Sequence, residues 1–112
     1  MGNIPEEMRV EVKALVSLLV RGDIADMHRQ GLFGVSDLDV VQEVLESYPG
    51  EMTMPPDSAF SDFATYGDVR NGTFVADFPL WFDGAESDLY ALIAQGEGSA
   101  KRRLYVYDLR VP

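Results

Sequence analysis

The sequence contains no cysteine and a single histidine, His28. The absence of thiols excludes disulfides, thiolate metal sites and thiol catalysis, and it favours a cytoplasmic protein. His28 has no HxxE or HxH spacing, and no serine stands in a GxSxG or SxxK context, so nucleophilic catalysis is not expected. The many acidic residues leave a hydrolase that uses only carboxylates open. We predict that the protein is not an enzyme and needs no cofactor or metal.

Long apolar runs and basic residues are also scarce. No run approaches the roughly 20 apolar residues that span a bilayer, and the N-terminus lacks a secretory signal pattern. Nine basic residues against nineteen acidic ones give a net charge of −10. Between Asp37 and Asp88 there are twelve acids and one base, Arg70, whereas the remainder is close to neutral. Phosphate would be repelled, so nucleic acid and anionic membranes are not expected partners.

Helix signals fill the first half of the chain, which as a whole (1–112) fits a single domain. Acids after Pro5 and apolar residues at helical spacing predict a helix over 6–21 that ends at Gly22. Its apolar stripe is Met8, Val12, Leu15, Val16 and Leu19, widened by Val10, Ala14, Leu18 and Val20. Shorter helices are expected over 24–30 and 38–48. The proline-containing segment 51–63 is expected to be a connector, with one helical turn after Asp57.

From Ala64 onward the apolar period becomes two, which is typical of strands. Asn71-Gly72 predicts a type I′ hairpin between strands near 64–70 and 73–82. Further strands are expected near 88–95 and 102–111, the last with Leu109 on the same face as its tyrosines. Pro79 cannot donate to a ladder, so its strand should be at an edge or bulged there. These signals predict an α+β fold with two or three N-terminal helices on one face of a four-stranded antiparallel meander. The face that receives the helices carries Phe74, Phe78, Leu80 and Phe82.

An acidic stretch, 83–88, separates two apolar runs. It lacks the alternating ligand pattern of a calcium loop, so it is expected to be a turn and not a metal site. Acids next to exposed aromatic rings are good protein-binding chemistry, because rings anchor a partner and acids attract a basic one. Trp81, Tyr90, Tyr105 and Tyr107 could instead simply close the core. The predicted partner-binding residues are Trp81, Asp83, Glu86, Asp88 and Tyr90, with Asp39, Glu43 and Glu46 on the outer side of the third helix.

The segments VKALVSLLVRGD, LESYPGEMTMPPDSAF and LWFDGAESDLYALIA resemble a family of small bacterial proteins of unknown function. The resemblance covers most of the chain and implies no catalytic residue. It rests on Tyr48, Pro49, Gly50, Pro55, Pro56, Leu80, Trp81, Ser87, Asp88 and Leu89. In size, acidity and helix–strand order the chain is also similar to immunity proteins that neutralise bacterial toxins.

Two functions are therefore expected from different classes. The first is an acidic, non-enzymatic module that binds a protein such as a basic toxin domain and acts as a monomer or weak homodimer. The second resembles the NTF2-like or cystatin-like folds, with a small-molecule pocket between sheet and helices. A buried, hydrogen-bonded Asp77 or Asp108 in a deep pocket would favour the second. A filled core with an acidic outer face would favour the first.

Overall fold

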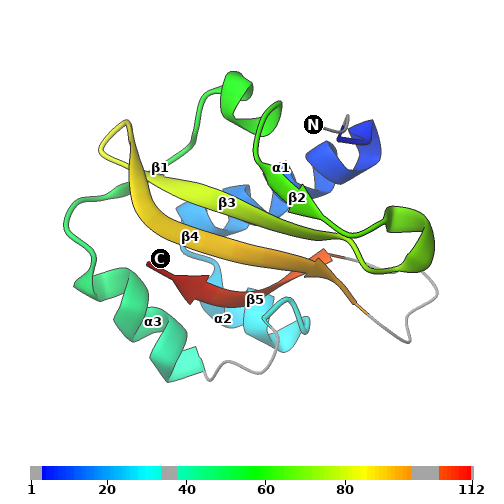
Figure 1. The fold of residues 1–112 in the computed structure, drawn as a ribbon. Helices are drawn as coiled ribbons and strands as arrows, with labels where there is room; N and C mark the ends of the chain where they lie inside the picture. Colours follow the sequence, from blue (N-terminus) through cyan, green and yellow to red (C-terminus); the bar gives the residue numbers. More distant parts are fainter. Residues whose placement is uncertain (1–3, 34–37, 97–103, 112) are drawn as a thin grey trace.

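Within residues 4–33, 38–96 and 104–111, which the computed structural model describes, three α-helices precede five β-strands (Figure 1). The helices are α1 (Glu6–Arg21), α2 (Ile24–Arg29) and α3 (Leu38–Ser47). The strands are β1 (Met52–Thr53), β2 (Ala64–Tyr66), β3 (Val75–Phe82), β4 (Ala85–Gln95) and β5 (Leu104–Arg110). Two short 3-10 helices, η1 (Asp57–Phe60) and η2 (Val69–Asn71), lie between strands. The predicted α+β class and the turn after Asp57 are confirmed.

The first helix buries the apolar stripe that its sequence predicts. All five residues of that stripe, from Met8 to Leu19, are buried. Acids occupy the first turn. Gly22 ends the helix with a left-handed φ of 77°, and its N–H donates to the carbonyls of Leu18 and Leu19. Val10 is 58% exposed and Ala14 is exposed too. The expected widening of the stripe is therefore wrong at these two positions, because α1 presents only one side to the sheet.

The strands form an antiparallel sheet in the order β1-β3-β4-β5, with β2 also paired to β3. The meander from β2 to β5 is as expected, and its strand 102–111 is described from Leu104 onward. The two-residue strand β1 is an addition, because Met52 and Thr53 pair with Phe82 and Trp81 in the segment expected to be a connector. At the far edge, Phe33 forms a parallel bridge to Val106.

The hairpin between β2 and β3 differs from the sequence prediction. The strands do pair, with Ala64 opposite Asp77, but no two-residue type I′ turn joins them. Asp68 and Thr73 close a longer loop instead: the Thr73 Oγ1 accepts the Asp68 N–H at 2.9 Å. The Asp68 carboxylate accepts the Arg70 N–H at 2.9 Å and so begins η2. The local side-chain hydrogen bonds of Asp68 and Thr73 thus favour this longer loop over the type I′ turn that Asn71-Gly72 predicts.

The tight turn lies one hairpin later, at Asp83-Gly84. Phe82 pairs with Ala85, and the φ angles of the two turn residues are 52° and 77°. Positive φ at both positions is the mark of a type I′ turn, for which Asp-Gly is a preferred pair. The third strand of the meander therefore starts at Ala85 and not near Asp88. The acidic stretch 83–88 is only a two-residue turn followed by a strand.

The two faces of the sheet have different roles. Along β3 every second residue is buried, and the buried set joins α1 in one core. Figure 1 shows α1 and α2 passing behind the strands. The Phe78 ring contacts Phe60 and Phe63, with centroids 5.0 and 5.5 Å apart. The predicted helix-facing residues Phe74, Phe78, Leu80 and Phe82 are all buried.

Two bulges interrupt the regular pairing. Between Pro79 and Trp81 the register of β3 against β4 shifts, and the extra residues, 87–89, lie on β4 opposite Leu80. Pro79 itself fits the edge alternative, because β2 pairs with β3 only as far as Asp77 and β1 only from Trp81. Figure 1 shows β4 bending sharply toward the hairpin. The second bulge lies on β5, because Leu92 pairs with Asp108 but the next residue, Ile93, pairs with Val106. This bulge reverses the alternation after Val106, so Leu109 packs on the core and its predicted face is wrong.

Candidate protein-binding face

The face of the sheet that points away from the helices is rich in aromatic rings. We call it the open face; it comprises Tyr66, Val75, Asp77, Trp81, Glu86, Tyr90, Leu92, Tyr105, Tyr107, Asp108 and Arg110. Trp81, Tyr90, Tyr105 and Tyr107 are half-buried and none belongs to the core cluster. The interpretation that these rings close the core is therefore wrong. A covered sheet face would bury them, whereas here they line a surface.

Cross-strand pairing brings distant parts of the chain together on the open face. One row runs from Ala64 through Asp77 and Leu92 to Asp108. Tyr90 pairs with Arg110 in a neighbouring row. The bulge on β5 sets Asp108 and Arg110 on the open face, next to Tyr107. Side chains more than 40 residues apart in sequence thus share one surface.

A hollow of about 510 Å³ lies in this face. Tyrosines from three strands line it together with aliphatic and charged side chains. The lining residues are Ala64, Tyr66, Val75, Asp77, Tyr90, Leu92, Tyr107 and Arg110. Sequence analysis selected Tyr90 but missed Tyr66 and Leu92. The period-two alternation assigns each of them to a face of its own strand. Only the pairing register shows that these faces lie side by side on the sheet.

The charged groups at the hollow differ in their hydrogen bonds: Asp77 and Arg110 line it, and Asp108 lies beside it on the open face. Arg110 Nη2 donates to Asp108 Oδ2 at 2.9 Å, and Asp108 Oδ1 accepts the Leu109 N–H at 2.9 Å. Asp77, which is half-buried, forms no side-chain hydrogen bond or ion pair within the described residues. Neither aspartate is a buried acid in a deep pocket, so the observation that would favour the small-molecule alternative is not met.

A smaller hollow of about 290 Å³ separates α1 and α3 from β1. Leu19, Leu45 and Phe82 contribute to its wall, and Glu46 lies at it too. Neither Asp77 nor Asp108 lines this space. The hollow therefore has an apolar wall and an exposed acid, Glu46, but neither of the two aspartates whose burial in a pocket would favour the small-molecule alternative.

Asp83 has a structural role that sequence analysis did not assign. Its Oδ1 accepts the Glu51 N–H at 3.0 Å, and its own N–H donates to the Glu51 carbonyl at 2.8 Å. The Gly84 N–H donates to Thr53 Oγ1 at 2.9 Å. A Cβ on Gly50 would lie 2.5 Å from Asp83 Oδ2, so the glycine makes room for the carboxylate. Asp83 holds the hairpin tip against the chain that follows α3.

Asp88 is likewise engaged within the protein. The Tyr48 hydroxyl donates to Asp88 Oδ1 and accepts the Asp88 N–H at 3.3 Å. At the same bulge, Ser87 Oγ donates to the Leu80 carbonyl at 2.6 Å. The Tyr48 ring packs on Phe82 with centroids 4.6 Å apart. This set of contacts ties the end of α3 to β4, and Asp88 is exposed at its rim.

Trp81 and Glu86 form the part of the predicted site that reaches the open face near the hairpin. They are direct cross-strand partners, with Trp81 half-buried and Glu86 exposed. The indole Nε1 is shielded from solvent and has no hydrogen-bond partner among the described residues. The exposed part of the indole ring, next to an exposed carboxylate, is suited to contact a protein surface.

The predicted acids of α3 lie on the helix layer instead. Asp39, Glu43 and Glu46 are exposed, while Val41 of the same helix is buried in the core. The structure thus places the predicted site residues in two regions: Trp81, Glu86 and Tyr90 on the open face, and the α3 acids on the other layer. Asp83 and Asp88 form hydrogen bonds that hold the β3–β4 hairpin to residues that follow α3. Among the described residues, no three acids or histidines come close enough to hold a metal ion.

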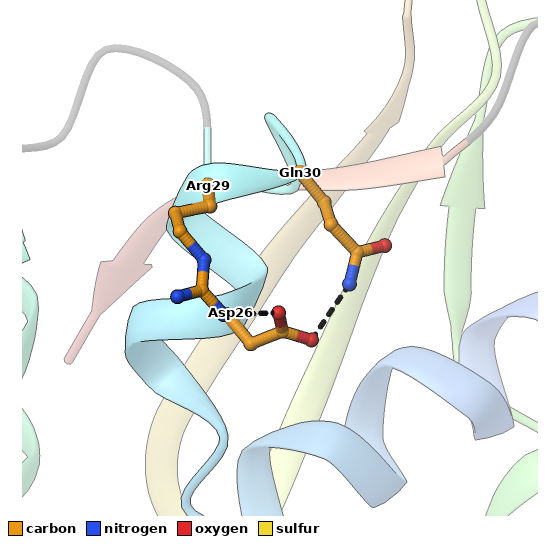
Figure 2. Close-up of polar contacts among 3 residues, drawn as sticks. All are labelled: Asp26, Arg29 and Gln30. Atoms are coloured by element: carbon orange, nitrogen blue, oxygen red, sulfur yellow. Dashed lines mark hydrogen bonds and ion pairs between the residues drawn. The ribbon is translucent and has the colours of Figure 1, made fainter.

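A third polar cluster lies on α2 and involves residues that sequence analysis did not select. Figure 2 shows Asp26 between Arg29 and Gln30. Its Oδ1 accepts Arg29 Nη2 at 2.6 Å and its Oδ2 accepts Gln30 Nε2 at 2.7 Å. The hydrogen bond from Arg29, and then that from Gln30, lowers the pKa of Asp26 below its ordinary value. Spacings of three and four residues make this a local helix clamp. His28 is exposed on the same helix.

These features describe a small α+β protein whose antiparallel sheet is covered on one face and aromatic on the other. Residues 16–112 match the family described as Domain of unknown function (DUF7668). The match spans most of the chain, and the protein therefore belongs to this family. The expected membership of a family of unknown function is confirmed. No curated protein and no solved structure matches the chain. None of the described helices is long and apolar enough to cross a membrane.

Proposed function

We propose that the protein is a non-enzymatic, acidic protein-binding module of the toxin-neutralising immunity type. The observation that carries the proposal is the open face, where tyrosines and Trp81 are half-buried on a face opposite the helices. Rings that have lost part of their hydration and have little rotamer entropy left to lose are favourable anchors for a partner. A partner that covers the open face would bury its aromatic rings, as the helices bury the apolar residues on the opposite face of the sheet.

The charge of the chain favours a basic partner. With a net charge of −10, association with a basic domain is steered electrostatically, whereas nucleic acid and anionic membranes are repelled. Toxin domains that cleave nucleic acid need basic clefts, which makes them suitable targets. The proposal places the protein in the cytoplasm as a monomer or weak homodimer.

The proposal is tested by affinity capture from the native host, with the product of the neighbouring gene co-expressed. We expect a basic protein to elute in stoichiometric amounts with the wild type and in clearly reduced amounts with Trp81→Ala. An α3 control, Val40→Ala, changes an apolar residue that is 54% exposed on the helix layer and should leave capture unchanged. Failure to capture any protein, or equal capture by all variants, would contradict the proposed role of this face.

A further inference from the structure

We infer that the hollow in the open face binds an arginine side chain presented by a basic protein partner. The inference rests on the proposed function and names the side chain of the partner that the open face would recognise. Tyr66, Tyr90 and Tyr107 line one hollow from three different strands. The faces of tyrosine rings carry negative potential and attract cations within about 6 Å of the ring centre. A hollow with several such rings is suited to a flat, charged group.

Among the described residues, Asp77 is the one carboxylate that lines the hollow, and it is left for a ligand. Arg110 is paired with Asp108 at 2.9 Å, so these two largely cancel each other. Asp77 projects from β3 between Ala64 and Leu92 and has no side-chain partner within the described residues. Two carboxylates against one guanidinium give this part of the face a net charge of −1. An incoming cation would therefore restore neutrality, whereas an anion would be repelled.

Arginine fits this arrangement better than lysine. Its planar guanidinium can stack on a tyrosine ring and at the same time form two parallel hydrogen bonds to a carboxylate such as that of Asp77. An ammonium is a compact, strongly hydrated point charge that can pair with the carboxylate but forms no planar two-bond fork and does not stack. The hollow, at about 510 Å³, has room for the whole side chain and part of the backbone that carries it.

The direct test is an NMR titration of the full chain, labelled with 15N and with 13C on tyrosine and leucine, with an acetylated and amidated Gly-Arg-Gly peptide. We expect saturable shifts that concentrate on Tyr66, Tyr90, Leu92 and Tyr107. The matched peptide with citrulline keeps the shape and removes the charge, and its affinity should fall about tenfold. The lysine peptide should bind several-fold more weakly than the arginine peptide.

Variants localise the effect. Asp77→Asn should weaken the arginine peptide about tenfold, whereas Glu43→Gln on α3, with the same loss of charge, should not change it. Tyr66 is 57% exposed and can be changed with little cost to the fold. Tyr66→Leu should weaken binding and Tyr66→Phe should retain it. Equal affinity for the arginine and citrulline peptides, or shifts centred outside the open face, would overturn the inference.

Its failure can be told apart from failure of the proposed function. If a basic partner is captured by the wild type and equally by Asp77→Asn and Tyr66→Leu, the arginine site is wrong and the binding function stands. If the arginine peptide titrates into the hollow as expected but no protein is captured, the site stands and the function fails.

Discussion

Asp83 holds the tip of the β3–β4 hairpin against the chain that follows α3, and one substitution should show it. Asp83→Ala removes the acceptor of the Glu51 N–H and places alanine at a φ of 52°. A lost hydrogen bond and a left-handed alanine together should cost about 1–3 kcal/mol in the free energy of unfolding. Urea denaturation provides the measurement.

Asp83→Asn is the matched control. Asparagine tolerates left-handed backbone and keeps an oxygen that can accept the same N–H. It should therefore lose less than half as much stability as Asp83→Ala. Two variants that both unfold at the wild-type urea concentration would show that the hairpin tip does not depend on this carboxylate.

The clamp around Asp26 predicts a specific dependence on pH. Its folded pKa lies below the ordinary value of 3.8, chiefly because of the hydrogen bond from Arg29. A lowered carboxyl pKa adds stability that is present above the unfolded pKa and is lost as the pH falls through the folded one. Asp26→Asn should thus be less stable than the wild type at neutral pH, and the difference should vanish under strongly acidic conditions.

Thermal unfolding of both proteins across this pH range measures the difference. Asp62→Asn removes an exposed carboxylate that has no side-chain partner among the described residues, and it corrects for the general loss of negative charge. A gap between Asp26→Asn and the wild type that widens toward acid pH would have the wrong sign for this mechanism.

At the scale of elements, α1 supplies much of the core through a narrow stripe. Leu15 lies in the middle of this stripe and is 5% exposed. Leu15→Ala should reduce the free energy of unfolding by about 2–5 kcal/mol, because the substitution removes buried methyl groups and leaves a cavity. Val10→Ala on the same helix is the comparison, since its side chain faces solvent and should change stability by less than about 0.5 kcal/mol. Equal denaturation midpoints for both variants would contradict the packing of α1.

Two pairs of residues with similar turn chemistry show where sequence reasoning reaches its limit at this scale. Asn71-Gly72 and Asp83-Gly84 both carry the signal of a type I′ turn, yet only the second adopts it. At the first, Thr73 and Asp68 close a longer loop with their own hydrogen bonds. The main apolar stripe of α1 and the alternation along β3, by contrast, depend on local spacing, and the sequence alone predicted them correctly. Competing local bonds decide a turn, and their outcome cannot be read from the pair alone.

At the scale of the whole molecule, the exposed acids of the predicted site lie on α3, at the β3–β4 hairpin and on the open face, whereas the aromatic anchors lie only on the open face. Association with a basic partner should slow as salt rises, because exposed charges are screened within about 8 Å at physiological ionic strength. Reversal of the α3 acids (Asp39, Glu43 and Glu46 to Lys) and Glu86→Lys should each lower the association rate. Asp83 and Asp88 are unsuitable for reversal, since their carboxylates hold the hairpin.

Trp81→Ala should act on the opposite kinetic step. Loss of an anchor in the open face speeds dissociation and costs on the order of 2 kcal/mol in binding, with little effect on association. Kinetic titration of the captured partner at low and high salt separates the two effects. An association rate that responds neither to salt nor to either charge reversal would show that the acidic residues do not steer binding and contribute only to solubility.

The candidate site was harder to predict than the fold. Trp81 and Tyr90 were selected from their neighbouring acids, and the structure does place them on the open face. The α3 acids could not be placed, because the layer on which a helix lies depends on packing. Tyr66 and Arg110 were missed because strand register, including a bulge, brings them to the hollow. Sequence spacing within one strand does not contain that information.

The bulge on β5 decides which face of the sheet each residue after Val106 occupies. Without the bulge, plain alternation of all residues from Val106 onward would turn Asp108 and Arg110 inward and Leu109 outward. The cost of two inward charges would far exceed that of almost any substitution at an exposed position nearby. Members of the family that keep this face should therefore either keep the bulge or lose it together with its one extra residue, because both arrangements leave Asp108 outside and Leu109 inside.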